Sequence, residues 1–198
     1  MATDFAERLA GAKAGDEACF VELFRSVQPS LLRYLSTLGG ALAEDVAAET
    51  WVSVLKGLPR FKGDEACWRS WVFTIAHARL RDAQRKAVRT PVPADTTRLL
   101  ETRPGRADVA LDVEEMFSTE AALALVGWLP KDQSEIVLLR YVAGLDVAAT
   151  AKVVGKRPGA VRVAAHRGLK RLAELLGPAP GGSGAGAVTH SKRGSVTE

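Results

Sequence analysis

Apolar side chains recur every three or four residues along most of this 198-residue chain, and this spacing restricts the fold to helices. The clearest set consists of Phe20, Leu23, Phe24, Val27 and Leu31. Pro29 is expected to start a new turn or to bend this first helix. The spacing also predicts helices from about Ala43 to Leu58, before Pro59, and from about Ala66 to Arg89. No segment alternates apolar and polar residues as a strand does, so the sequence predicts an all-α fold.

Two segments interrupt this pattern and divide the chain. Residues 91–112 carry three prolines and few large apolar residues, which predicts a mobile linker. The tail after Leu176 is rich in Gly, Ala and Ser, cannot form a core and is predicted to be disordered. We therefore predict a first helical domain over 1–90, a linker over 91–112, a second helical domain over 113–176 and a tail over 177–198.

The composition allows a folded core and excludes several classes of protein. Apolar residues make up 47% of the chain and charged residues 25%, as in an ordinary globular protein. No apolar run of about 18 residues could span a membrane, and the N-terminus, with Asp4 and Glu7, does not resemble a secretory signal. Cys19 and Cys67 form no CxxC pair, so we expect no disulfide, no zinc or other metal site, and two buried thiols. These features predict a cytoplasmic protein.

The segment from Leu129 to Leu176 has the sequence features of a helix-turn-helix. A helix begins at Leu129-Pro130, and Asp146 can cap a short helix that runs to Val154. Gly155 then supplies a turn, and Pro158 stands where a first helical position tolerates it. A short helix, a glycine turn and a longer helix in this order predict a helix-turn-helix.

The final helix is predicted to have one apolar and one basic side. At about 100° per residue, the apolar side comprises Val161, Ala165, Leu169 and Leu172. The opposite side comprises Arg162, Val163, His166, Arg167 and Lys170. Six Lys or Arg and no acid lie between Lys156 and Arg171, which suits a DNA major groove, with Lys156, Arg157, Lys170 and Arg171 as candidate phosphate contacts. A basic side that merely faces solvent is the alternative.

An acidic face is predicted on the helix that begins near Ala43. Asp45 and Glu49 are four residues apart and share one face, whereas Val46, Val54 and Leu58 share another. The two carboxylates therefore point away from the core and suit a basic partner surface. The alternative is a solvent-exposed helix whose N-terminal acids are favoured by the helix dipole.

The next helix combines aromatic and basic residues. Its first half has an apolar stripe of Trp68, Trp71, Val72 and Ile75. Its second half carries Arg79, Arg81, Arg85, Lys86 and Arg89 against a single acid, Asp82. Aromatic rings beside a dense basic run suit melted DNA, because bases stack on rings and phosphates need cations. The alternative is that both tryptophans belong to the core.

The order of these segments resembles that of the extracytoplasmic-function sigma factors of bacterial RNA polymerase. It consists of the acidic helix, the stretch WVFTIA, the linker, the stretch LPKDQSEIVLLRYVAGL and the helix-turn-helix. The resemblance extends from Phe20 to Leu176. It implies two helical domains, sigma domain 2 and sigma domain 4, joined by a flexible linker. It also implies a protein that binds core polymerase and directs promoter-specific initiation, without cofactor or catalysis, under the control of an anti-sigma factor.

The resemblance also assigns residues. Asp45 and Glu49 match the family's contacts to core polymerase. The loop of Phe61, Lys62, Gly63, Asp64, Glu65 and Ala66 matches the loop that captures a flipped −10 base, and we assign −10 contacts to it together with Trp71, Arg79, Arg85 and Lys86. The −35 contacts are assigned to Arg157, Arg162, Val163, His166, Arg167 and Lys170. The chain departs from the family by having Ala48 and Ala78 in place of a common Gln and Asn.

Two other functions are compatible with parts of the sequence. A stand-alone regulator with a C-terminal helix-turn-helix would account for residues 113–176. A helical metallohydrolase could use Asp45, Glu49 and His77, but the sequence has no ExxH, HExxH, P-loop or GxSxG motif and only three histidines.

Overall fold

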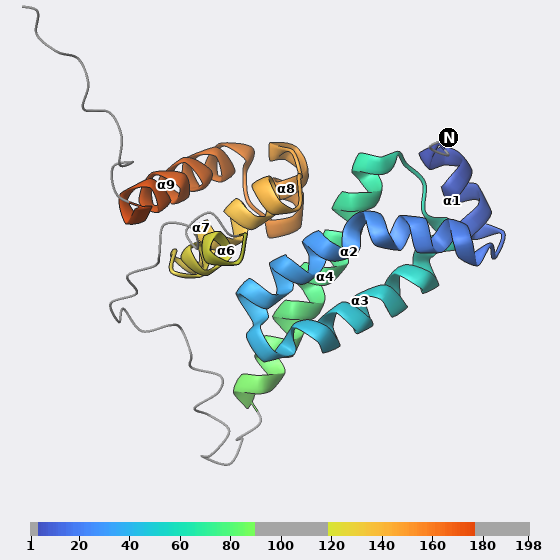
Figure 1. Ribbon diagram of the computed structural model, residues 1–198, viewed down its shortest axis with the longest axis horizontal. Helices are drawn as coiled ribbons and strands as arrows, with labels where there is room; N and C mark the ends of the chain where they lie inside the picture. Colours follow the sequence, from blue (N-terminus) through green and yellow to red (C-terminus); the bar gives the residue numbers. More distant parts are fainter. Residues whose placement is uncertain (1–3, 90–118, 177–198) are drawn as a thin grey trace, which may run out of the picture.

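The computed structural model describes residues 4–89 and 119–176, and every regular element in these two ranges is helical (Figure 1). The first range contains α1 (Phe5–Lys13), α2 (Glu17–Gly39), η1 (Gly40–Leu42), α3 (Ala43–Gly57), η2 (Leu58–Arg60) and α4 (Glu65–Arg89). The second contains α6 (Thr119–Gly127), α7 (Lys131–Val137), the π-helical turn η4 (Leu138–Val142), α8 (Val147–Val154) and α9 (Pro158–Leu176). The predicted all-α class is confirmed. The predicted linker and tail lie outside the described residues.

Helices α1 to α4 form what we call the N-terminal bundle, whose core consists of large side chains. Among its completely buried residues are Val27, Leu31, Tyr34, Leu35, Val54, Trp68, Val72 and Phe73. Helix α2 continues through Pro29, so the predicted new turn does not form. A proline inside a helix costs about 3 kcal/mol. Burial of Val27 and Leu31 on either side of Pro29 offsets that cost.

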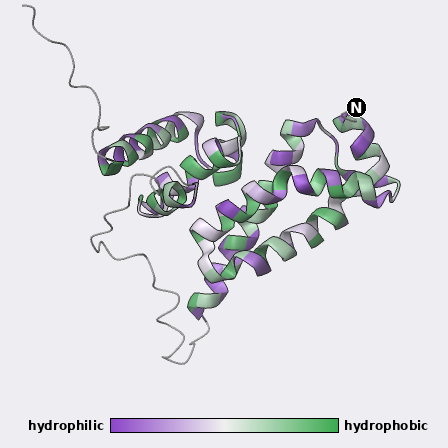
Figure 2. Ribbon diagram, viewed as in Figure 1, coloured by the Kyte–Doolittle hydropathy of each residue, from purple (hydrophilic) through white to green (hydrophobic). Residues whose placement is uncertain are grey.

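Helices α6 to α9 form the C-terminal bundle, in which the helix-turn-helix is built as predicted. The Asp146 carboxylate accepts a hydrogen bond from the backbone N–H of Ala149 at 2.6 Å and so caps α8. Gly155 ends α8 with a φ of +66°, a left-handed conformation that glycine adopts without strain, and Pro158 begins α9. Hydrophobic and hydrophilic residues form separate patches along α9, as expected for a helix with one buried face (Figure 2).

The buried face of α9 differs in one position from the prediction. Val161 and Ala165 are buried as expected, but Leu169 is 40% exposed and Gly168 is buried in its place. Position 168 lies about 20° around the helix from Val161, whereas position 169 lies about 80° away. The glycine also allows α9 to approach α7 closely, because a Cβ there would lie 2.8 Å from the Cγ2 of Val137.

The two bundles pack against each other (Figure 1). Helix α6 contacts α2, and α8 contacts α4. A single apolar cluster passes from Leu31 and Phe73 of the N-terminal bundle to Leu129 and Leu138 of the C-terminal bundle. A smaller cluster of Ile136, Ala151, Val161 and Ala165 holds the helix-turn-helix together. The core between the bundles is therefore continuous.

The expectation of two buried cysteines is wrong for Cys67, whereas Cys19 is half-buried. Cys67 lies in the first turn of α4, and its outward direction follows from Trp68, the next residue, which points into the core. Within the described ranges, no helix combines the length and the apolar character needed to cross a membrane.

Candidate nucleic-acid interface

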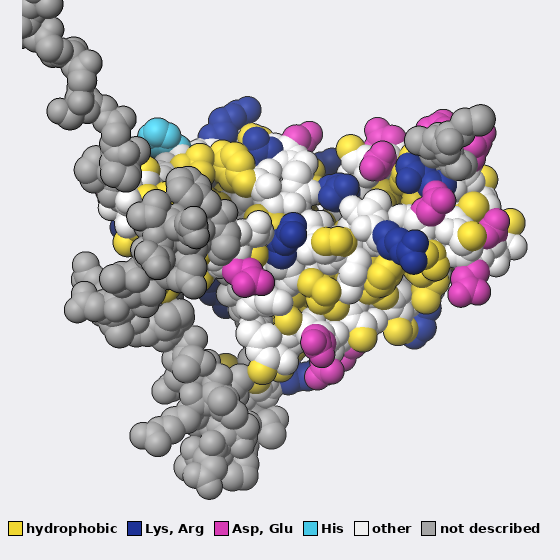
Figure 3. Space-filling view, viewed as in Figure 1, with side chains coloured by type: hydrophobic (Ala, Val, Ile, Leu, Met, Phe, Trp, Pro, Cys, Tyr) yellow, Lys and Arg dark blue, Asp and Glu magenta, His cyan; other side chains and the backbone are white. Residues whose placement is uncertain are grey.

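The outer face of α9 is exposed and basic, and one of its cations, Lys170, pairs with Glu174 at 3.9 Å. Arg162, Val163, His166, Arg167 and Lys170 are all exposed, with Val163 at 50%. Their positions are fixed from behind, where α9 packs against α7 and α8. In Figure 3, Lys and Arg side chains lie over both bundles and a histidine lies over the C-terminal bundle, whereas acidic side chains are densest around α1. The structure therefore brings five of the six predicted −35 residues together on one accessible helix face, and the sixth, Arg157, directly precedes α9.

The phosphate contacts predicted near the start of α9 fall into two groups. Arg157 is exposed. Lys156 is half-buried, and its Nζ lies 2.6 Å from the carboxylate of Asp132 on α7. The hydrogen bond from Lys156, aided by its charge, lowers the pKa of Asp132 below its ordinary value, so the carboxylate stays ionised. A DNA phosphate would have to displace Asp132 before it could bind Lys156. It could bind Arg157 directly.

The predicted acidic face of α3 is also exposed, and it carries apolar residues that the sequence analysis missed. Asp45 and Glu49 face solvent, whereas Val46 and Val54 of the same helix are buried. One and two turns further along, Val52 is 50% exposed and Leu55 is 49% exposed. Helical spacing from Asp45 could have revealed both, since positions 45, 49, 52 and 55 share one face. An acidic and apolar stripe of this kind suits a protein partner better than solvent.

The conformation of the loop before α4 depends largely on Phe61 and Asp64, two of the residues predicted to contact the −10 element. Phe61 is only 8% exposed, and its ring stacks on Trp71 with centroids 4.9 Å apart. Lys13 donates a hydrogen bond to the Phe61 carbonyl at 2.6 Å. The Asp64 carboxylate accepts a hydrogen bond from the backbone N–H of Cys67 at 2.8 Å, and this bond lowers the pKa of Asp64.

These contacts leave the middle of the loop accessible. Lys62 and Gly63 are exposed between the two anchored residues. Gly63 has a φ of +150°, and a Cβ there would lie 2.6 Å from the Cβ of Cys67, so the loop requires glycine at this position. Lys62 is therefore an exposed cation in the loop, whereas Glu65 and Ala66, which were predicted to belong to the loop, form the first turn of α4.

The two tryptophans of α4 differ in burial. Trp68 is completely buried, in agreement with the core alternative, whereas Trp71 is half-buried between Phe61 and Gly57. One edge of Trp71 therefore remains available beside the loop.

The basic run of α4 divides between two faces, which the sequence analysis did not foresee. Arg79 and Lys86 are exposed on one face, and Arg79 donates a hydrogen bond to the Oγ of Ser53 on α3 at 2.9 Å. Arg81, Arg85 and Arg89 lie on a second face, where they line a cleft of about 530 Å³. His77 and Gln84 of α4, together with Lys131 of α7, complete its charged and polar lining. This second face borders the contact between the bundles.

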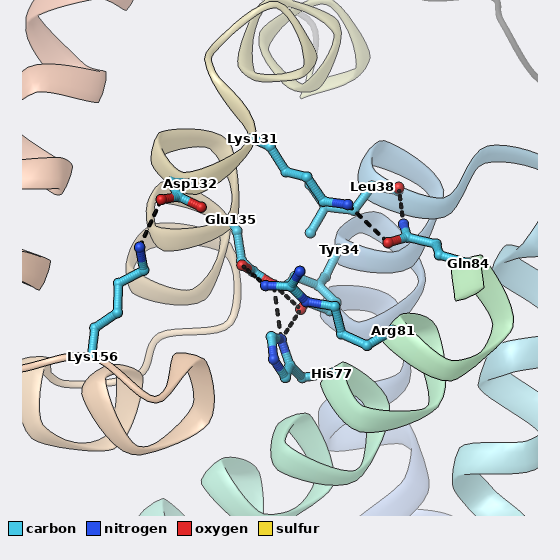
Figure 4. Close-up of polar contacts among 9 residues, drawn as sticks. All are labelled: Tyr34, Leu38, His77, Arg81, Gln84, Lys131, Asp132, Glu135 and Lys156. Carbon is cyan, nitrogen blue, oxygen red and sulfur yellow. Dashed lines mark hydrogen bonds and ion pairs between the residues drawn. The ribbon is translucent and has the colours of Figure 1, made fainter. Parts of the chain in front are cut away.

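At that contact, which we call the seam, a buried carboxylate crosses from one bundle to the other (Figure 4). Glu135 of α7 is 3% exposed. Its carboxylate accepts a hydrogen bond from the Nδ1–H of His77 at 2.8 Å and one from the hydroxyl of Tyr34 at 3.2 Å. Arg81 lies 3.8 Å from the other oxygen. Sequence analysis did not select Glu135, although a lone acid within the run SEIVLL was a visible signal.

The residues of the metallohydrolase alternative do not meet. Asp45 and Glu49 face solvent on α3, and His77 is hydrogen-bonded at the seam. Within residues 4–89 and 119–176, no three His, Cys, Asp or Glu side chains are grouped as they would be to hold a metal ion.

Comparison with known proteins places both bundles in one family. Residues 23–90 match the model of Sigma-70 region 2, and residues 119–172 match that of Sigma-70, region 4. The chain is 39% identical to the ECF RNA polymerase sigma factor ShbA of Streptomyces griseus over 83% of this chain and 91% of that protein. It is 34% identical to the ECF RNA polymerase sigma factor SigD of Mycobacterium tuberculosis over 85% of this chain and 82% of that protein. A stand-alone regulator would not account for the match of the first region.

Solved structures show the same fold. The chain is similar to CnrH in complex with the cytosolic domain of CnrY, with a TM-score of 0.57 and 22% identity over 87% of this chain and 96% of that chain. It is also similar to the sigma factor RpoE of Bartonella quintana in complex with the anti-sigma factor NepR, with a TM-score of 0.59 and 22% identity over 79% of this chain and 96% of that chain.

Proposed function

This chain belongs to the extracytoplasmic-function group of RNA polymerase sigma factors, and we propose that three of its exposed surfaces divide the work of promoter-directed initiation. As a sigma factor, it binds core RNA polymerase and directs promoter-specific transcription. The proposal concerns which residues do so: the outer face of α3 for polymerase, the loop and outer face of α4 for the −10 element, and the outer face of α9 for the −35 element.

The −35 assignment is the best supported of the three. Arg162, Arg167 and Lys170 are exposed on one face, and the small residues behind them fix the helix against α7 and α8. Arginine can donate two hydrogen bonds to a guanine edge in the major groove, whereas lysine more often meets a phosphate as a point charge. We therefore assign base reading to the arginines, with Val163 and His166 beside them, and backbone contacts to Arg157 and Lys170.

The −10 assignment combines the exposed loop with the outer face of α4. Lys62, Arg79 and Lys86 are exposed and can neutralise phosphates of the melted strand. Trp71 offers a ring edge beside the loop. Arg85 lies on the second face of α4, where it lines the cleft and pairs with Asp82 at 3.7 Å, so it would meet DNA only from that side. Phe61, Gly63 and Asp64 give the loop its shape, which a pocket for a flipped base requires.

Core-polymerase binding is assigned to Asp45 and Glu49, together with Val52 and Leu55. The exposed acids would give the approach its electrostatic direction, and the two apolar side chains would lose contact with water on binding. The observation that carries this assignment is the single stripe in which α3 presents all four residues away from its own core.

Membership of the family also supports a proposal about regulation and location. CnrH and RpoE were solved with CnrY and NepR, and we propose that an anti-sigma factor likewise holds this chain inactive. We further propose that the chain acts in the cytoplasm and has no catalytic activity of its own.

The experiment that tests the α3 assignment is a charge reversal. Asp45→Lys with Glu49→Lys should abolish co-purification with core polymerase and transcription from a promoter library, while circular dichroism stays unchanged. Glu7→Lys with Glu17→Lys is the matched control, because both are exposed acids in the first turns of α1 and α2. Normal polymerase binding by the folded α3 double variant would refute the assignment.

A further inference from the structure

The seam holds a charged residue that only the packing of the two bundles can satisfy. Glu135 projects from α7 into the N-terminal bundle, and its three polar partners, Tyr34, His77 and Arg81, all belong to α2 and α4 (Figure 4). A buried carboxylate without partners costs several kcal/mol, which excludes a passive role for this side chain. Within residues 4–89 and 119–176, the N-terminal bundle therefore supplies all three polar partners of Glu135.

The electrostatics of Glu135 agree with its geometry. Burial alone would raise the pKa of the carboxyl, but the hydrogen bond and charge of His77, the charge of Arg81 and the hydrogen bond of Tyr34 together lower it. Burial and the neighbouring carboxylate raise the pKa of Tyr34 well above its ordinary value, so its hydroxyl remains a donor. Glu135 is consequently ionised and receives charge-assisted hydrogen bonds from the other bundle.

A second polar bridge reinforces the seam at its rim. Lys131, one turn before Glu135 on α7, donates a hydrogen bond to the amide oxygen of Gln84 at 2.9 Å. The amide nitrogen of Gln84 in turn donates to the carbonyl of Leu38 at 3.0 Å (Figure 4). The bridge joins α7 to α4 and α2 and fixes the register of the docked bundles.

This docked arrangement is too short for a promoter. The −10 and −35 elements are about 25 base pairs apart, or roughly 85 Å along B-DNA. Helix α8 has eight residues, is about 12 Å long, contacts α4 and directly precedes α9. The two helices assigned to the promoter elements are therefore much closer together than the elements themselves. They can act together only after the bundles separate.

We infer that Glu135 anchors a closed state of the free protein, in which α7 docks onto the surface formed by Tyr34, His77 and Arg81 and must leave it before both promoter elements are bound. Separation transfers Glu135 to water and frees Arg81 on α4, so opening adds a cation to the helix assigned to the −10 element. The outer face of α3 lies on the side of the N-terminal bundle away from α7 in Figure 1, and it stays open to polymerase. The need for opening rests on the proposed −10 and −35 roles, whereas the closed state itself does not.

The closed state is tested by a distance in the full-length chain without DNA or polymerase. Fluorophores on the exposed native Cys67 and on a cysteine introduced by Ala173→Cys, with Cys19→Ser, report the separation of the bundles by single-molecule energy transfer. The parent should show one short distance. Glu135→Lys, which places a cation against Arg81, and Arg81→Glu, which places a second carboxylate against Glu135, should each raise the ratio of open to closed molecules about tenfold or more.

The control variant is Glu22→Lys, a matched charge reversal inside the N-terminal bundle, where Glu22 pairs with Arg8 at 3.9 Å; it should leave the distance unchanged. Arg81→Glu keeps the test valid if Glu135→Lys fails to fold, because it alters only the N-terminal side. An open parent, or folded Glu135 and Arg81 variants that keep the short distance, would overturn the closed state.

The need for opening is tested by locking the seam. Gln84→Cys and Lys131→Cys, in a chain that also carries Cys19→Ser and Cys67→Ser, can be joined by a short bis-maleimide. The cross-linked protein should still bind core polymerase but lose initiation, whereas the same variant without the cross-linker should initiate. Initiation by the cross-linked protein would overturn the need for opening. Failure of both forms would instead count against the proposed DNA roles.

Discussion

Helices α4 and α9 are both long, amphipathic and basic, yet they use their two faces differently. The buried face of α4 carries large rings, including Trp68 and Phe73, whereas that of α9 carries Val161, Ala165 and Gly168. The cations on the outer face of α9 are all exposed to solvent, although Lys170 pairs with Glu174, whereas those of α4 are divided between solvent and the seam. The comparison teaches that α9 presents its charge in full to the DNA that we propose it reads, whereas part of the charge of α4 is held by the other bundle.

The largest change in the free energy of unfolding is expected for a substitution on the buried face of α4. Trp68→Ala should lower the free energy of unfolding by about 3–5 kcal/mol, because the ring is completely buried among other aromatic side chains. Urea titration followed by circular dichroism would measure this loss. Trp71→Ala is the control, since the half-buried ring should cost less. Equal losses for the two variants would show that burial does not distinguish the two tryptophans.

The next prediction concerns the close approach of α9 to α7. Gly168→Ala should cost about 1–3 kcal/mol of unfolding free energy, because the new methyl group would lie 2.8 Å from Val137. Gly159→Ala, on the same helix with open space around it, should cost nothing and can gain up to about 1 kcal/mol in helix propensity. A stabilised Gly168 variant in thermal unfolding would mean that the two helices can move apart freely.

The outer face of α9 should separate base reading from backbone contact. Arg162→Ala or Arg167→Ala should lose about 1–3 kcal/mol of preference at one −35 position, because a bidentate arginine distinguishes guanine from other bases. Lys170→Ala should weaken binding evenly across sequences. Transcription from every single-base variant of the −35 element measures both. If all three variants lose activity uniformly, sequence choice lies with the loop from Phe61 to Ala66 and not with α9.

The smallest effect is expected at the start of α9, where one cation is already paired. Lys156→Ala should change DNA affinity by less than about 1 kcal/mol, because the lysine must first leave Asp132. Arg157→Ala should weaken binding more and reduce the slope of affinity against salt concentration. Titration of a labelled promoter with the polymerase holoenzyme at several salt concentrations measures both slopes. A larger loss for the lysine variant would contradict the pairing.

Much of the α9 site could be predicted from its own sequence because the determining interactions are local. The Asp146 cap, the Gly155 turn and the Pro158 start all act within a few residues, and all three were found where expected. The exposed basic face followed from helical spacing alone. Only the edge of the apolar face was predicted wrongly, since Leu169 lies too far around the helix to be buried.

The α4 site depended on residues distant in the chain, and the prediction was accordingly less complete. Burial of Phe61 depends on the ring of Trp71, ten positions later. The division of the basic run depends on α7, which lies beyond residues 90–118. A pattern within one helix does not contain the position of another helix.

The sequence by itself determined the helices, their caps, the two-bundle organisation and the family, because these follow from local spacing and from motifs in a fixed order. The tertiary structure alone decided which charges are free and which are held. Glu135 illustrates the reason: its three partners, Arg81, His77 and Tyr34, lie 54, 58 and 101 positions away in the chain, and only the packing of the helices brings the opposite charges together.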